Sequence, residues 1–149
     1  MMVIAASFLM TSNVQAANKS LSGVKTIKIE LVDEAKGACW TNLKEVREYA
    51  EEKLRIQGIN VVDDYPKSNG RVVFETGMYW LTVTVVGNRW YTDGSGPCTG
   101  FLRFSIHTHV WLDSVWHVAI LEGSTTGAKN NTNFNNYIIQ GLQSLFERL

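Results

Sequence analysis

Apolar and polar residues alternate along residues 24–31, where Ile27, Ile29 and Leu31 fall on the same side. Because successive side chains of a β-strand point to opposite faces, a period of two predicts a strand that is buried on one face. The same pattern, or a short apolar run, predicts further strands at residues 59–62, 79–86, 101–112 and 115–121.

Two other segments repeat their apolar residues every three or four positions, which is the spacing of an amphipathic helix. The first covers residues 42–57, where Asn42 and Glu45 have the spacing of a capping box and Gly58 is the expected stop. The second covers residues 134–149. The apolar stripes are Leu43, Val46, Ala50 and Leu54 in the first helix and Phe134, Ile138, Leu142, Leu145 and Leu149 in the second.

The order of these segments predicts an α+β fold. Residues 87–100 and 122–132 contain clusters of Gly, Ser, Thr or Asn and are expected to be loops, and residues 71–74 fit either a strand or one turn of helix. Two amphipathic helices can cover one face of one sheet. We therefore expect a two-layer, open-faced sandwich of order β-α-β-β-β-β-α, with a mostly antiparallel sheet and both helices on one face.

Composition narrows the class of protein. Of the 149 residues, 45% are hydrophobic and 19% charged, so the chain can bury the core of one domain and is not expected to be disordered. Lys and Arg total 14, as do Asp and Glu. Binding to a nucleic-acid backbone needs a basic surplus, so nucleic acid is not an expected partner. No apolar run reaches the roughly 18 residues of a membrane-spanning helix, so the chain is not expected to span a membrane.

The start of the chain has the pattern of a signal for export. Residues 2–10 are apolar, residues 11–13 are polar, and Val14 and Ala16 are small residues at the positions that signal peptidase reads. We therefore expect a signal peptide at residues 1–16 and a single α+β domain at 17–149, in a periplasmic or secreted protein. No Lys or Arg precedes Lys19, so the alternatives are an upstream start or a buried N-terminal strand.

The two cysteines agree with an oxidising compartment. Cys39 and Cys98 lie far apart in the sequence and match no spacing of zinc ligands. Two such cysteines in an exported protein usually pair. We therefore expect a Cys39–Cys98 disulfide, and the alternative is two buried thiols.

The uncovered face of the sheet is the expected binding surface. If Leu102, Phe104 and Ile106 face the helices, the residues that alternate with them face outward. Trp and Arg are enriched where protein interfaces bind most strongly. The alternative is that the N-terminal segment or a loop covers this face. The predicted contact residues are Trp80, Arg103, His109 and Trp111.

All three histidines of the chain lie in the hairpin predicted for residues 101–121. A turn centred near residue 113 would place His109 opposite His117, with His107 on the same face. Three imidazoles so arranged could hold zinc and turn its bound water into a nucleophile. A two-residue turn instead places Val110 opposite His117 and breaks the site. Surface histidines without a metal are the main expectation, so no cofactor is predicted and zinc is the alternative.

The sequence has no motif of a familiar catalytic class. Residues 94–96 are Gly-Ser-Gly without the wider Gly-x-Ser-x-Gly elbow, and neither a Gly-Lys-Ser/Thr loop nor a Cys-x-x-Cys pair occurs. A disulfide-bonded cysteine cannot act as a nucleophile. We therefore do not expect an enzyme.

This layout resembles the small periplasmic α/β modules of bacterial envelope-assembly and transport-auxiliary proteins, such as the lipopolysaccharide-assembly lipoprotein and the periplasmic domain of the curli secretion pore. The resemblance lies in residues 24–31, 42–62, 79–86, 101–121 and 134–149. It implies a binding or scaffolding role. Most such modules begin with a lipidated cysteine, which is not expected here.

Three functions follow as hypotheses. The first, favoured by the topology, is an exported, non-enzymatic binding or assembly module of the cell envelope or of a secretion or transport system. It would bind a protein partner through its exposed sheet face, and a homo-oligomer is compatible with it. The second is a metal-binding protein or small metal-dependent enzyme that uses the three histidines. The third is a secreted inhibitor or immunity-type protein.

Overall fold

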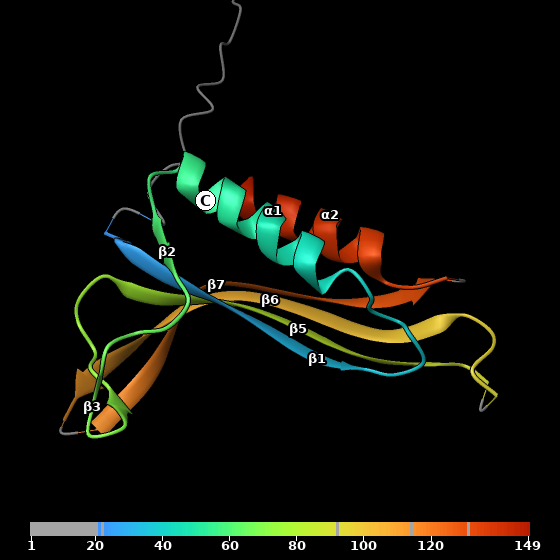
Figure 1. Cartoon of the computed structure of the whole chain (residues 1–149), viewed down its shortest axis with the longest axis horizontal. Coiled ribbons are helices and arrows are strands. Elements are labelled where there is room, and N and C mark those ends of the chain that lie inside the picture. Colours follow the sequence, from blue (N-terminus) through green and yellow to red (C-terminus); the bar gives the residue numbers. More distant parts are fainter. Residues whose placement is uncertain (1–20, 22, 92, 114, 131) are drawn as a thin grey trace, which may run out of the picture.

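The computed structural model describes residues 21–149 apart from residues 22, 92, 114 and 131. Five strands form one sheet in the order β2-β1-β5-β6-β7, and both helices pack on the same face of it (Figure 1). The predicted two-layer α+β sandwich is therefore confirmed. The predicted signal peptide, residues 1–16, lies outside the described residues.

The sheet is mixed. Its strands are β1 (Thr26–Ala35), β2 (Asn60–Val62), β5 (Met78–Arg89), β6 (Cys98–Leu112) and β7 (Val115–Asn130), and its helices are α1 (Leu43–Ile56) and α2 (Asn135–Phe146). β1 runs parallel to β2 and β5, whereas β5, β6 and β7 are successively antiparallel. Two short strands, β3 (Lys67–Ser68) and β4 (Arg71–Val72), pair only with each other. No helix of the described residues is long and apolar enough to cross a membrane.

The core forms where the two predicted helical stripes meet one face of the sheet. α1 buries Val46, Ala50 and Leu54, and α2 buries Ile138, Leu142, Leu145 and Phe146. On the helix-facing side of the sheet, the side chains that alternate as predicted and are buried are Ile27, Ile29, Leu81, Val83, Val85, Leu102, Phe104 and Ile106. Each large side chain removed from water contributes about 1.5–3 kcal/mol, which fixes the face of every strand.

The predicted capping box at the start of α1 does not form. The amide oxygen Oδ1 of Asn42 accepts a hydrogen bond from Trp40 Nε1 at 3.1 Å, and its Nδ2 donates to Glu45 Oε2 at 3.0 Å. Asn42 therefore makes no side-chain cap to the backbone. Its position before the helix was predictable, but its partners were not.

The loop predicted at 122–132 is mostly strand, because β7 continues to Asn130. The loop predicted at 87–100 is present but shorter, because β5 continues to Arg89 and β6 already begins at Cys98. The glycines serve close packing: Gly87 pairs with Gly100 across the strands, and a Cβ on Gly87 would lie 2.6 Å from the Phe134 ring. These glycines, which made the segment look like a loop, allow the Phe134 ring to pack directly on the strand backbone.

The predicted Cys39–Cys98 disulfide is present. It joins the segment before α1 to the first residue of β6, with the two Cα atoms 5.6 Å apart and both residues buried. Such a bridge is typical of proteins that fold in an oxidising compartment.

Candidate interaction surface

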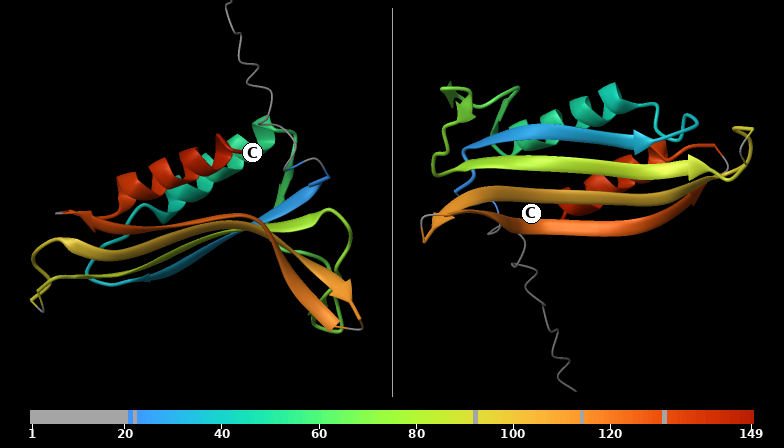
Figure 2. Two further views of the ribbon diagram at one scale, coloured as in Figure 1. Left: turned by 180° about the vertical axis from the view of Figure 1, so that it is seen from behind. Right: turned by 90° about the horizontal axis from the view of Figure 1, so that it is seen from below.

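β6 and β7 extend beyond the helices as a bent two-stranded ribbon. The pairing register shifts between Ile106 and His107, so that Ile106 faces Glu122 whereas His107 faces Ile120. The extra residue, Leu121, makes a β-bulge, and bulges bend a ribbon and increase its twist. Beyond the bulge the ribbon turns away from α1 and α2 (Figure 2, left). We call residues 107–121 the distal hairpin.

The distal hairpin exposes large apolar side chains on both of its faces. Exposed apolar side chains gathered in one segment mark interaction sites on soluble proteins. Asp113 is the only acidic residue in this segment, which contains no Lys or Arg. The exposed side chains are Trp111 (54%), Leu112 (56%), Val115 (54%), Trp116 (45%), Val118 (57%), Ile120 (55%) and Leu121 (40%).

The same hairpin carries a free edge of the sheet. β7 is the last strand in the sheet order, with 16 residues, whereas the opposite edge strand, β2, has three. Figure 2 (right) shows no other described element alongside the outer edge of β7. Edge strands are usually short or carry charges that prevent pairing with another chain. Residues 115–121 carry none.

The four predicted contact residues all lie on the sheet face away from the helices, but they do not form one exposed patch. Trp111 is 54% exposed, whereas Trp80 is only 6% exposed. His109 is half-buried, and Arg103 lies exposed before the bulge, on the polar part of the face. Their partners across the strands are His107 for Trp80, Thr84 for Arg103, Val118 for His109 and Trp116 for Trp111.

Trp80 is buried because residues 63–77, which we call the cover loop, fold over it. The rings of Tyr65 and Phe74 lie 4.7 and 5.8 Å from the Trp80 ring between centroids. The Tyr65 hydroxyl accepts a hydrogen bond from the Tyr79 N–H at 3.0 Å, which ties the loop to β5. Burial raises the pKa of this hydroxyl to about 12. The prediction that Trp80 is an exposed contact residue is therefore wrong, and the alternative, cover by a loop, is what the chain adopts.

An ion-pair cluster holds the first part of the cover loop. The Asp64 carboxylate accepts hydrogen bonds from Lys67 Nζ at 2.6 Å and from Lys28 Nζ at 3.1 Å. These two ammonium groups lower the pKa of Asp64 to about 2. The cluster is solvent-exposed, so we assign it a positioning role and little stability.

The three histidines do not converge. His107 and His109 share a face, with ring centroids 6.0 Å apart, but the register pairs His117 with Val110 on the other face. This is the register of a two-residue turn, so the expected His109–His117 pairing is wrong. Among the described residues no group of three potential metal ligands of the His, Cys, Asp or Glu type comes together.

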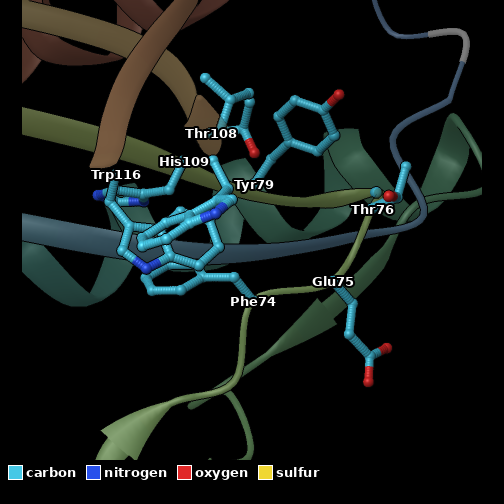
Figure 3. A pocket seen from close by; sticks show the side chains of 10 residues that line it. Phe74, Glu75, Thr76, Tyr79, Thr108, His109 and Trp116 are labelled. Atoms are coloured by element: carbon cyan, nitrogen blue, oxygen red, sulfur yellow. The ribbon is translucent and has the colours of Figure 1, made fainter. Parts of the chain in front are cut away.

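A pocket of about 360 Å³ lies where the cover loop meets the distal hairpin. In Figure 3 the Phe74, His109 and Trp116 side chains gather on one side of it, while Glu75 points away from them. Phe74 lies 4.8 Å from the His109 ring and 4.5 Å from the Trp116 ring between centroids. These contacts hold one face of Trp116 against the molecule and leave the outer edge of β7 free.

Sequence reasoning found Trp111 but missed its neighbours on β7. Trp116, Val118 and Ile120 lie on the same face as Trp111, and the Trp111 and Trp116 rings meet edge to face at 4.9 Å. The available signal was the run of residues 115–121, which has seven residues without a charge. This pattern predicted a strand but gave no indication that the strand would lie exposed at an edge.

Comparison of the chain with models of protein families and with curated proteins gave no match. The geometry of the surface is therefore the basis for inferring a function.

Proposed function

We propose that this chain is an exported, non-enzymatic binding or assembly module that binds a protein partner through the distal hairpin. The observation that carries the proposal is an uncharged, exposed edge strand, residues 115–121, whose Trp116 lies against the exposed Trp111. Exposed apolar patches mark interaction sites, and Trp residues contribute strongly at interface centres.

The proposed setting is the bacterial cell envelope. The disulfide supports an oxidising compartment, and the signal-like pattern of residues 1–16 supports export. The resemblance of the layout to periplasmic assembly and transport modules supports an accessory role in that compartment. A secreted inhibitor would use the same surface and would differ only in the protein that it binds.

Site-specific photo-cross-linking in exporting cells tests this function. Benzoylphenylalanine at position 118, on the distal hairpin, is expected to give a discrete cross-linked product. The same group at position 56 is the control, because Ile56 is an exposed apolar residue (71%) at the end of α1 and lies outside the distal hairpin. No product from position 118, or the same products from both positions, would contradict the proposal.

A further inference from the structure

We infer that the partner of the distal hairpin is a second copy of this chain, paired antiparallel along β7. The inference depends on the proposed function, because it takes the distal hairpin as the binding surface. The two copies would form one continuous ten-stranded sheet related by a two-fold axis, with all helices on the same face.

The backbone provides the first reason. An edge strand presents unpaired N–H and C=O groups that another strand can satisfy, and residues 115–121 of β7 form such an edge at the tip of the sheet. The other edge of the sheet, β2, has only three residues and cannot support a ladder of this length. The same seven residues of a second copy, running antiparallel, complete the ladder.

The side chains provide the second reason. A register centred on Val118 sets Trp116 opposite Ile120 on one face and His117 opposite Ala119 on the other. Every pair on the first face is apolar, and no charged side chain lies in residues 115–121. Cross-strand pairs of aromatic and β-branched residues stabilise a sheet, and like charges directly opposite each other destabilise it. This register therefore contains aromatic–β-branched pairs and no pair of like charges.

Exposure and charge agree with a self-pairing surface. Trp116, Val118 and Ile120 are each about half exposed on one face of residues 115–121, so a second copy would cover apolar side chains that are open to water in one chain. The chain has no net charge, so two copies meet without overall repulsion. A lipid bilayer fits less well, because the unpaired edge of β7 would remain unsatisfied in hydrocarbon.

Sedimentation of the purified protein tests the inference. We expect a dimer for the wild type and a monomer for Val118→Lys, with the dimer Kd raised more than about tenfold. Ile56→Lys is the matched control, because it introduces the same charge at an exposed apolar position on α1, and it should stay dimeric. A wild-type protein that remains monomeric to about 100 µM, far above the Kd of a specific complex, would overturn the inference.

Disulfide trapping tests the register without depending on the stability of a lysine variant. Val118→Cys lies on the proposed two-fold axis, where Cα atoms about 4.5–5.5 Å apart suit a disulfide. It should form a covalent dimer on mild oxidation. Thr125→Cys is exposed on the same strand and face and should not. Equal trapping of both variants would overturn the proposed register.

The mass of the photo-cross-linked product separates failure of this inference from failure of the proposed function. A product of twice the chain mass supports the second copy. A product of another mass overturns the second copy and keeps the binding function. If position 118 gives no protein product, and the wild type floats with phosphatidylethanolamine–phosphatidylglycerol vesicles while Val118→Lys does not, both proposals fail.

Discussion

Trp80 and Trp111 lie on the same face of the sheet and have opposite environments. Trp80 lies beneath the cover loop, between Tyr65 and Phe74, and is 6% exposed. Trp111 lies beyond the bulge, in contact with Trp116, and is 54% exposed. The face of a strand is a local property, whereas exposure depends on what else packs there.

This contrast predicts different costs for the same substitution. Trp80→Ala should lower the free energy of unfolding by about 3–5 kcal/mol, because it leaves a cavity in a buried cluster. Trp111→Ala should lower it by about 1 kcal/mol or less, since mainly an aromatic contact is lost. Urea unfolding in the Val118→Lys background measures both values without a contribution from subunit dissociation. Similar losses for the two variants would contradict the assigned environments.

His107 should make the free energy of unfolding depend on pH. Burial, together with the neighbouring His109, lowers the pKa of His107 below its ordinary value of 6.5, while Glu30 acts in the opposite sense. The unfolded chain therefore binds more protons than the folded chain as the pH falls through about 6.5. The free energy of unfolding should decrease from pH 7.5 toward pH 5.5 and level off below the folded-state pKa.

Denaturant unfolding across this pH range measures the effect. His107→Gln should flatten the curve, because it removes the group that titrates differently in the two states. His117→Gln is the control, since it makes the same substitution at an exposed histidine on the other face of the hairpin; all variants carry Val118→Lys so that subunit dissociation does not contribute. An unchanged slope in His107→Gln would show that another group is responsible.

At the scale of elements, α2 packs tightly on β6 at Gly141. A Cβ on Gly141 would collide with the Phe104 ring, which lies fully inside the core. Glycine is here the residue that allows α2 to approach the sheet, although glycine is otherwise unfavourable within a helix. The helical pattern of residues 134–149 gave no indication of this contact.

Gly141→Ala should therefore destabilise the protein by about 1–3 kcal/mol through overpacking, despite the roughly 1 kcal/mol that alanine gains in an isolated helix. Gly127→Ala on β7 is the control, because nothing lies within 4 Å of the added Cβ and it should cause no comparable loss. Thermal unfolding of the two variants gives the comparison. A Gly141→Ala variant more stable than the wild type would contradict the close packing of α2 on Phe104.

At the scale of the whole molecule, the two ends of β6 differ. The strand begins at the disulfide, where Cys98 is bonded to Cys39 beside the helices. It ends in the distal hairpin, which the helices do not cover (Figure 2). One end of the sandwich is thus cross-linked by the Cys39–Cys98 disulfide, and the other end exposes the apolar side chains of the distal hairpin.

Loss of the Cys39–Cys98 disulfide should lower the free energy of unfolding substantially. The Cys39→Ser/Cys98→Ser variant should lose about 4 kcal/mol of unfolding free energy in the loop-entropy model, because the bridge restricts the unfolded chain. Denatured wild-type protein without reductant should react with no thiol reagent. Two reactive thiols per chain in that titration would contradict the bridge, and an unchanged stability of the double variant would contradict its role.

The sequence alone determined the two helices, the faces of the strands and the disulfide pair. These features follow from local periods and from chemistry that any fold of this chain must satisfy. The apolar stripe of residues 42–57 and the alternation of Leu81, Val83 and Val85 have only one side on which they can leave water. The α+β class followed because two helices with one apolar stripe each can cover one apolar face of a sheet.

Tertiary structure alone decided which of those faces became the candidate site. The length of β7, the burial of Trp80 and the separation of His117 from His107 depend on pairing register, on one bulge and on a polar loop that folds back. Each is set by contacts between residues far apart in the chain, where local composition carries little information. An uncharged strand has the same pattern whether it lies in a core or at an open edge. The position of β7 as the last strand of the sheet made residues 115–121 an edge, and the ends of the helices left their faces uncovered.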